Sequence, residues 1–242
     1  MRIALDHTSE IGVRAGRLLL GEPALDQLGI VRRNVRDRDR RLRRVDKVTG
    51  FDAVVTDDPD SSILAEAVAA GVPCVLWSDD PDASDDIGQT PVLVGANIVT
   101  GIGRSLVARA TAEADADAQL LFAWTEPGKP FRSGEPVSFP EPVGARWGSR
   151  RAMTNRRVEV AAPVPDEWAG LVVRASTDTE ALTFGIADLA THLEAIALAA
   201  GSVIAAMGVV PSGSHRPEAF ANDYLAAAFL IGLDMASFTS AG

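Results

Sequence analysis

The sequence predicts an α/β protein, in which a mostly parallel sheet covered by helices is followed by a smaller α+β domain with C-terminal helices. Two observations support this prediction. The chain opens with a short apolar strand, Arg2–Leu5, which leads through a tight turn into an amphipathic helix over Val13–Leu20. Strand and helix patterns then alternate to about residue 114, whereas strand patterns dominate the next part of the chain.

The remaining elements of the first half follow the same alternation. Apolar runs bounded by turn residues predict further strands at Gln27–Arg32, Phe51–Thr56, Pro73–Trp77 and Pro91–Val94. Helices are predicted from Ser62 to the glycine stop at Gly71, and again across Ile102–Ala110. Strands joined by helices form a parallel sheet covered on both faces, so the first half is predicted to be a Rossmann-like domain.

The second half has a different rhythm. Strands are predicted at Ala118–Trp124, Arg157–Ala162, Leu171–Ala175 and Ala181–Ile186, and the last three are close enough in sequence for antiparallel pairing. A Pro/Gly-rich passage lies between the first two of these strands. Two helices are predicted to close the chain, an Ala-rich one over Leu189–Met207 and one from Pro217 to about Ala236, separated by a loop at Pro211–Arg216. We therefore expect two domains, residues 1–114 and 115–242.

Composition restricts the classes of partner. The chain has 242 residues and a formal net charge of -10, so nucleic acid and anionic lipid are not expected partners. A single cysteine, Cys74, excludes an internal disulfide, and the three scattered histidines form no recognisable metal set. The sequence contains no apolar stretch of membrane-spanning length, which predicts a cytoplasmic protein. The Ala-rich helix is apolar on more than one face and must be buried, so we expect a homodimer.

The turn after the first strand is the first candidate binding site. In a Rossmann-like domain this turn approaches the dinucleotide pyrophosphate, and here it contains His7, Thr8, Ser9 and Gly12. Of the three glycines of the dinucleotide fingerprint, only the helix-packing one is present, at Gly12. Asp6 and Glu10 place carboxylates near a helix N-terminus that would otherwise attract phosphate.

The second candidate site is a basic segment that follows the second strand. Residues 32–47 contain eight arginines and one lysine against three aspartates. One interpretation is a solvated, charged connection. The other uses position, because an arginine at the end of the second strand of such a domain can pair with the 2′-phosphate of NADP. Arg32 and Arg33 are the candidates.

Four segments resemble NAD(P)-dependent reductases of the saccharopine dehydrogenase and dihydrodipicolinate reductase kind. They are the opening strand-turn-helix, the stretch Asp52–Asp57 with Leu64–Pro73, the segment from Val94 to Ile102, and the passage Trp124–Gly144. The resemblance covers about the first 150 residues. It implies that Asp57 and Asn97 lie at the dinucleotide site, and that the cofactor is NADP or NAD.

Two functions remain open at this point. The first is a divergent NAD(P)-dependent oxidoreductase-like protein that acts on an unknown small molecule. The second is a non-catalytic binding or regulatory protein that retains the fold without dinucleotide chemistry, in which case there is no cofactor. The lysine-rich and histidine-rich signature of dihydrodipicolinate reductases is absent, and Glu126, Lys129 and Arg132 receive no role. No catalytic residue is therefore assigned.

Overall fold

The structure is a computed structural model that describes residues 1–6, 9–33, 39–56, 61–79, 88–130, 132–165 and 167–241. Its internal contacts separate the chain into two compact units. Unit 1 comprises Met1–Ile102 and Glu194–Leu233, and unit 2 comprises Gly103–Leu193 and Asp234–Gly242. This division differs from the expected boundary at residue 114, because the last two helices belong to the same unit as the first half of the chain.

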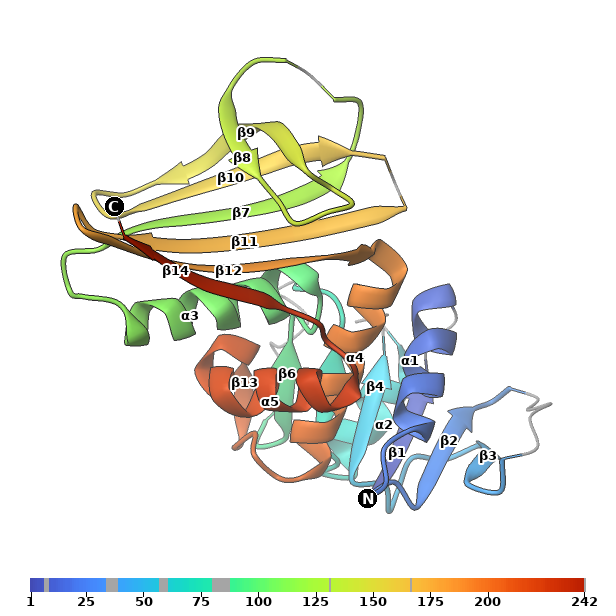
Figure 1. The fold of residues 1–242 in the computed structure, drawn as a ribbon. Helices are drawn as coiled ribbons and strands as arrows, with labels where there is room; N and C mark the ends of the chain where they lie inside the picture. The colour runs from blue at the N-terminus through green and yellow to red at the C-terminus, as the bar shows by residue number, and fades with distance from the viewer. Residues whose placement is uncertain are drawn as a thin grey trace. The chain divides into compact units, whose positions relative to one another are not determined.

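Unit 1 is built on a seven-stranded sheet in the order β13-β6-β5-β4-β1-β2-β3 (Figure 1). All neighbouring strands in this sheet are parallel. The strands are β1 (Arg2–Asp6), β2 (Gln27–Val31), β3 (Leu42–Val45), β4 (Ala53–Thr56), β5 (Cys74–Leu76), β6 (Pro91–Val94) and β13 (Gly213–His215). The prediction of a parallel Rossmann-like sheet is confirmed.

The first two helices of unit 1 begin where a serine hydroxyl accepts a hydrogen bond from a free backbone amide. Helix α1 (Glu10–Leu20) starts after Ser9, whose hydroxyl accepts from the Ile11 amide, and α2 (Ser62–Ala69) starts in the same way after Ser61. The later helices of unit 1 are the π-helical turn η2 (Ile98–Gly103), most of α4 (Ala190–Ala206), the short η3 (Pro217–Phe220) and α5 (Ala221–Ile231), whereas α3 (Arg104–Glu113) belongs to unit 2.

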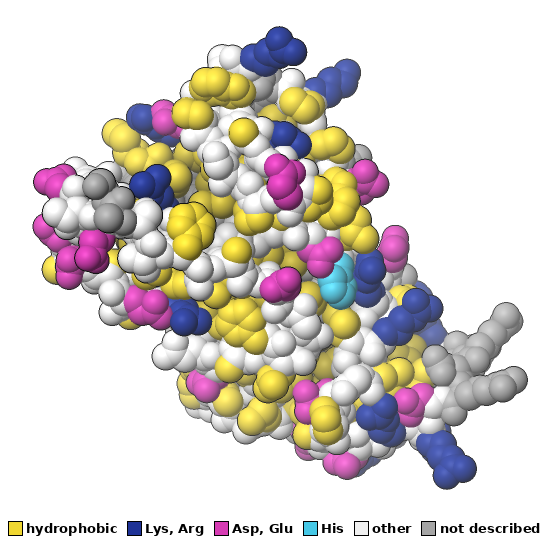
Figure 2. Space-filling view, in the orientation of Figure 1, with side chains coloured by type: hydrophobic (Ala, Val, Ile, Leu, Met, Phe, Trp, Pro, Cys, Tyr) yellow, Lys and Arg dark blue, Asp and Glu magenta, His cyan; other side chains and the backbone are white. Residues whose placement is uncertain are grey.

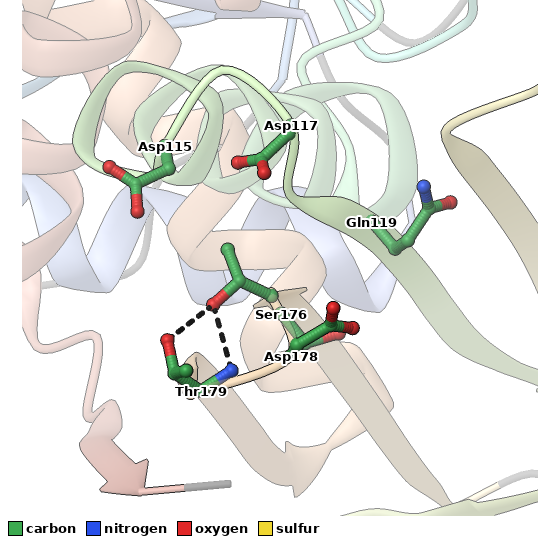
Figure 3. Close-up of a pocket in the computed structure, with 7 residues that line it drawn as sticks. Asp115, Asp117, Gln119, Ser176, Asp178 and Thr179 are labelled. Carbon is green, nitrogen blue, oxygen red and sulfur yellow. Dashed lines mark hydrogen bonds between the residues drawn. The ribbon is translucent and has the colours of Figure 1, made fainter.

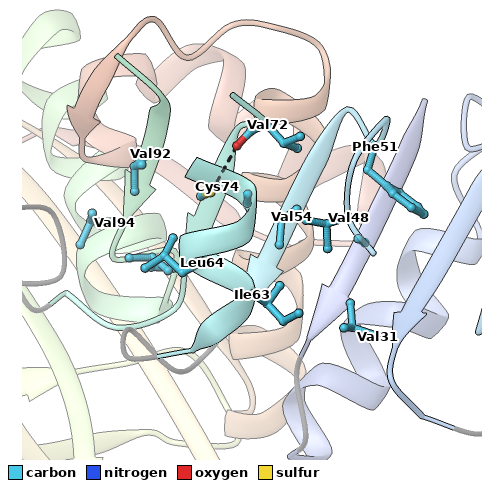
Figure 4. Packing of buried hydrophobic residues seen from close by; sticks show 13 residues of the cluster. Val31, Val48, Phe51, Val54, Ile63, Leu64, Val72, Cys74, Val92 and Val94 are labelled. Atoms are coloured by element: carbon cyan, nitrogen blue, oxygen red, sulfur yellow. Dashed lines mark hydrogen bonds between the residues drawn. The ribbon is translucent and has the colours of Figure 1, made fainter. Parts of the chain in front are cut away.

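The core on one face of this sheet is continuous from β2 to β6 (Figure 4). Val31, Ala4, Val54, Leu76 and Val92 contribute to it from β2, β1, β4, β5 and β6, and Ile63 of α2 belongs to the same cluster. Burying such side chains contributes about 1.5–3 kcal/mol each. The thiol of Cys74 belongs to the same core, where burial raises its pKa to about 12. It therefore acts as a small apolar group, as expected from its sequence context.

Helix α4 is buried inside unit 1 over its last three turns. A Cβ at Gly201 would lie 3.0 Å from Val75 Cγ1 and 3.1 Å from Leu93 Cδ2, so the helix approaches the sheet closely. Tyr224 of α5 donates a hydrogen bond from its hydroxyl to the Ala197 carbonyl oxygen (2.8 Å). The apolar character of α4 is thus satisfied within one chain, and the expected homodimer stays a prediction.

Unit 2 is organised around a mixed sheet in the order β14-β12-β11-β7-β10-β9-β8. The strands are β7 (Gln119–Pro127), β8 (Glu135–Ser138), β9 (Ala145–Met153), β10 (Arg157–Val164), β11 (Trp168–Ser176), β12 (Glu180–Leu189) and β14 (Ala236–Ala241). Strands β11 and β12 pair in antiparallel fashion, whereas β10 lies parallel to β7. The predicted α+β second domain is confirmed as a fold class.

Five strands lie where the sequence predicted none. Strand β3 lies in the basic segment, β8 and β9 overlap or follow the Pro/Gly-rich passage, β13 lies in the loop before the last helix, and β14 closes the chain. The predicted final helix ends early, because Gly232 adopts a φ of 127° after Ile231. Among the described residues, none of the helices has the length and apolarity needed to span a bilayer.

Candidate functional site

The carboxyl ends of β1, β2, β4, β5 and β6 lie along one edge of the unit 1 sheet, because the strands are parallel. The chain order reverses at β1, which has β2 and β3 on one side and β4, β5 and β6 on the other. In open α/β sheets, ligands bind outside the carboxyl ends of the strands at such a switch point. This edge is therefore the candidate site.

The turn between β1 and α1 is described at its two ends. The hydroxyl of Ser9 accepts from the Ile11 amide (3.2 Å), and Gly12 is buried in the first turn of the helix. His7 and Thr8 lie outside the described residues. Asp6, at the end of β1, accepts a hydrogen bond from the Ser61 hydroxyl (2.9 Å), so its carboxylate is held at the N-terminus of α2. Glu10 is exposed.

A second glycine contributes to the packing of α1 on the sheet. A Cβ at Gly16 would lie 3.3 Å from Leu5 Cδ2 and 3.5 Å from Leu28 Cδ2. Gly16 lies one helical turn beyond Gly12, on the same face of the helix. The dinucleotide fingerprint predicts only Gly12, but the spacing of four residues is a sequence signal that also points to Gly16.

Arg32 lies immediately after β2, at the position that the sequence analysis selected. Its guanidinium donates to the Ser62 hydroxyl (3.0 Å) and lies 3.7 Å from the Glu66 carboxylate, and about half of its side chain is exposed. Its φ is 52°, a left-handed conformation that is uncommon for a side chain with a Cβ. Such backbone geometry is often found at binding sites. Arg33 is exposed beside it.

Asn97 connects the ends of β5 and β6. Its Nδ2 donates to the Trp77 carbonyl oxygen (3.1 Å), and its Oδ1 accepts from the Thr100 amide (2.8 Å), which makes it a cap for η2. Thr100 in turn donates from its hydroxyl to Asp79 (3.1 Å). Asn97 therefore joins the segments that follow β5 and β6 through hydrogen bonds to their backbones. Asp57, the other residue implied by the resemblance, lies outside the described residues.

Glu194, near the start of α4, is a member of the edge that the sequence analysis did not select. Its Oε2 accepts from the indole Nε1 of Trp77 (2.8 Å) and from the Ile98 amide (3.1 Å). Burial raises the pKa of Glu194 to about 7, although both hydrogen bonds oppose the rise. A carboxyl group that titrates near neutrality is typical of functional sites. The sequence feature that could have identified Glu194 is its position as a charged residue within an apolar, Ala-rich helix.

Tyr224 supports the same region from α5. Its side chain is fully buried, and burial together with the charge of Glu194 holds its pKa well above the usual value. A Cβ at Gly101 would lie 2.4 Å from the Tyr224 hydroxyl oxygen, so the π-helical turn approaches this ring closely. Tyr224 is thus a neutral hydrogen-bond donor that fixes α5 against α4 and η2.

Unit 2 contains an open hollow of about 540 Å³ at the start of β7 (Figure 3). Asp115, Asp117 and Asp178 contribute carboxylates to it, and the Thr177 hydroxyl accepts from the Thr179 amide (3.4 Å). Within the parts of the chain that the structure describes, no group of three or more His, Cys, Asp and Glu is placed to hold a metal ion. The hollow therefore has no defined chemistry beyond its negative charge.

Several charged residues of unit 2 form ion pairs with one another. Glu159 is buried and lies 3.0 Å from the Arg104 guanidinium and 3.1 Å from that of Arg157. Glu126 forms an ion pair with Arg151. On the face shown in Figure 2, basic and acidic side chains are interspersed with apolar ones.

No protein-family model matches this sequence, and no curated protein matches it. Solved structures do match. Homospermidine synthase from Legionella pneumophila, in complex with NAD, has a TM-score of 0.65 and 9% identity over 99% of this chain and 91% of that one. Dipicolinate-bound dihydrodipicolinate reductase from Paenisporosarcina sp. TG-14 has a TM-score of 0.55 and 9% identity, and the match covers 89% of this chain and 97% of that one.

A third match is DAP dehydrogenase from C. glutamicum in complex with DAP, with a TM-score of 0.53 and 12% identity over 90% of this chain and 93% of that one. At these identities the likeness establishes the fold. The chain has the Rossmann-like dehydrogenase fold with a second mixed-sheet part, and the resemblance to dihydrodipicolinate reductases is confirmed at that level.

Proposed function

We propose that this protein binds a nicotinamide dinucleotide along the carboxyl edge of the unit 1 sheet and acts as an NAD(P)-dependent oxidoreductase on a small molecule. The observation that carries the proposal is the position of Arg32, which follows β2 with its guanidinium half exposed. Homospermidine synthase from Legionella pneumophila, which has the same fold, was solved in complex with NAD. The bound dinucleotide would supply or accept the hydride.

Three features of the chain fit a dinucleotide. Strand β1 is followed by helix α1, and Gly12 and Gly16 of that helix are both buried. The guanidinium of Arg32 offers several donors, which suits a 2′-phosphate better than a ribose hydroxyl. The carboxylate of Asp6 already accepts from Ser61, so part of its charge is compensated. His7, Thr8, Ser9 and Arg33 complete the predicted contacts.

The proposal is tested by substituting Arg32. In Arg32→Ala, we expect the Kd for NADPH to increase about tenfold while the Kd for NADH stays unchanged, because only NADPH carries the 2′-phosphate. Arg43→Ala is a matched control, since Arg43 is an exposed arginine of β3 in the same basic segment. Titration calorimetry measures both constants. Absence of saturable binding of either dinucleotide at millimolar concentration would contradict the proposal.

A second candidate function is a binding or regulatory role without hydride chemistry. The position of Asp6 favours it, because a carboxylate ends β1 where a phosphate would approach. Two like charges about 5 Å apart at an effective dielectric of about 20 repel by about 3 kcal/mol, which is about a hundredfold in affinity. If this function holds, the natural protein binds no dinucleotide, whereas Asp6→Asn gains measurable affinity. The cytoplasmic location and the homodimer stay predictions under either function.

A further inference from the structure

Glu194 lies on the half of the sheet edge that Arg32 does not occupy. Arg32 follows β2, on one side of the switch point, whereas Glu194 contacts Trp77 after β5 and Ile98 after β6, on the other side. A dinucleotide that crosses the switch point has its adenosine on one half of the sheet and its nicotinamide on the other. If Arg32 marks the adenosine half, the carboxyl group of Glu194 belongs to the nicotinamide half.

Both hydrogen bonds of Glu194 to described residues use the same carboxylate oxygen. Trp77 Nε1 and the Ile98 amide both donate to Oε2, at 2.8 and 3.1 Å. A proton on the neutral acid therefore resides on Oε1. Glu194 and Trp77 are both of intermediate burial, so neither residue is sealed within the core.

We propose that Glu194 makes the relative affinity of the protein for oxidised and reduced dinucleotide depend on pH. The oxidised nicotinamide ring has one positive charge and the reduced ring has none. Ionised Glu194 attracts only the oxidised form, whereas neutral Glu194 does not distinguish the two by charge. This inference rests on the proposed function, since it requires that a nicotinamide dinucleotide binds.

The expected size of the effect follows from Coulomb's law. Opposite unit charges about 6 Å apart at an effective dielectric of about 20 change affinity by about a hundredfold. Partial access of solvent and salt reduces this to about tenfold. Because burial raises the pKa of Glu194 to about 7, the change is centred near neutral pH.

Few other titratable groups of the described residues face Glu194. Tyr224 on α5 interacts electrostatically with Glu194, and its raised pKa keeps it neutral across this range. Asp79, after β5, is bonded to the Thr100 hydroxyl. On α4, His192 lies two residues earlier, on another side of the helix, and its Nε2 is 3.8 Å from Asp188. Aspartates 80, 82, 85 and 86 lie outside the described residues.

The experiment compares the Kd of NADP+ and of NADPH for the full chain between about pH 6 and about pH 8.5. The ratio of the two constants cancels the titration of the ribose phosphate, which both forms carry. We expect the preference for NADP+ to rise about tenfold with pH in the natural protein and to stay flat in Glu194→Gln. Glu113→Gln, an exposed carboxylate paired with Arg109, is expected to follow the natural profile.

Trp77→Phe provides a second, independent measurement. Its indole hydrogen bond lowers the pKa of Glu194, so removing the bond is expected to move the midpoint of the profile to higher pH. This variant also keeps the test decisive if Glu194→Gln does not fold. A flat ratio in the natural protein, an unchanged profile in Glu194→Gln, or an unmoved midpoint in Trp77→Phe overturns this inference alone. If neither dinucleotide binds, both the proposed function and this inference are wrong.

Discussion

At the scale of single residues, the site depends on side chains whose partners lie far away in the sequence. Glu194 meets Trp77 and Ile98, which precede it by 117 and 96 positions. Arg32 meets Ser62 in the same way, although its position at the end of a strand was readable from the sequence. A strand end is predictable from local patterns, whereas a contact between distant segments is not. Local patterns therefore predict the place of Arg32 but not that of Glu194.

The raised pKa of Glu194 predicts how stability varies with pH. The pKa is about 7 in the folded chain against 4.5 for the free side chain, so the folded state holds its proton more tightly. Stability from this group is therefore complete below pH 4.5, decreases between pH 4.5 and about 7, and stays low above. The shift corresponds to at most about 3 kcal/mol in the free energy of unfolding.

Urea denaturation of the natural protein and of Glu194→Gln at several pH values measures this contribution. We expect the difference in unfolding free energy between the two proteins to change by up to about 3 kcal/mol across the window and to be constant outside it. The corresponding difference for Glu113→Gln is the control and is expected to vary little there. Parallel stability profiles for the natural protein and Glu194→Gln would show that Glu194 does not titrate abnormally.

At the scale of elements, the carboxyl edge is shaped by the π-helical turn η2 between β6 and α3. A π-helical turn is rare and is found most often at functional sites. Asn97 caps this turn, Glu194 accepts its first amide, and Gly101 allows it to approach Tyr224. The sequence predicted a helix here from its apolar spacing, but the spacing does not distinguish a π-helical turn from an α-helical one.

Gly101 provides a test of this packing. In Gly101→Ala, the new methyl group would lie 2.4 Å from the Tyr224 hydroxyl oxygen, so the ring or the turn must shift. We expect the free energy of unfolding to fall by about 1–3 kcal/mol. Tyr224→Phe removes that oxygen and loses the bond to Ala197, at a cost of about 1 kcal/mol. In the double variant Gly101→Ala/Tyr224→Phe, the new methyl group no longer meets the hydroxyl oxygen. The loss of unfolding free energy caused by Gly101→Ala is therefore expected to be smaller than in the natural background.

A double-mutant cycle by chemical denaturation separates these effects. Gly71→Ala is a comparison variant, because Gly71 has a φ of 65° but no atom within 4 Å of an added Cβ, so its cost comes from the backbone alone and is independent of Tyr224. If the Gly101→Ala and Tyr224→Phe costs are simply additive, the close approach of η2 to Tyr224 does not limit stability.

The strands that the sequence missed share a physical cause. The residues of β3, Leu-Arg-Arg-Val, form a partly exposed edge strand whose charged side chains hide the apolar alternation. Strand β9 is also mostly exposed and contains three arginines. The strands that were predicted, such as β4 and β5, are buried along their whole length. Buried parallel strands read as continuous apolar runs, whereas edge strands do not.

At the scale of the whole molecule, the order of elements was predictable but their grouping was not. Alternating patterns predicted the parallel sheet, and closely spaced strands predicted the second sheet. Nothing in the sequence shows that the chain, after completing most of unit 2, returns to unit 1 with α4, β13 and α5. These elements complete unit 1, because α4 covers Val75, Leu93 and Ala96, all of which are fully buried.

This grouping predicts that a fragment cut at the apparent domain boundary is not stable. Residues 1–114 contain six of the seven strands of the unit 1 sheet, but they lack β13, which pairs with β6, and α4, which covers the sheet. Removing α4 exposes large apolar side chains that cost about 1.5–3 kcal/mol each to hydrate, and a small domain has only about 5–15 kcal/mol to lose. We therefore expect the fragment to lack a cooperative thermal transition by circular dichroism and to bind a hydrophobic dye.

A second chain, in which a flexible linker joins residues 1–102 to residues 194–233, is the control. It restores α4 and β13, so this second chain should unfold cooperatively. A cooperative transition in the 1–114 fragment would instead mean that the first six strands form a self-sufficient domain and that α4 and β13 are additions to it.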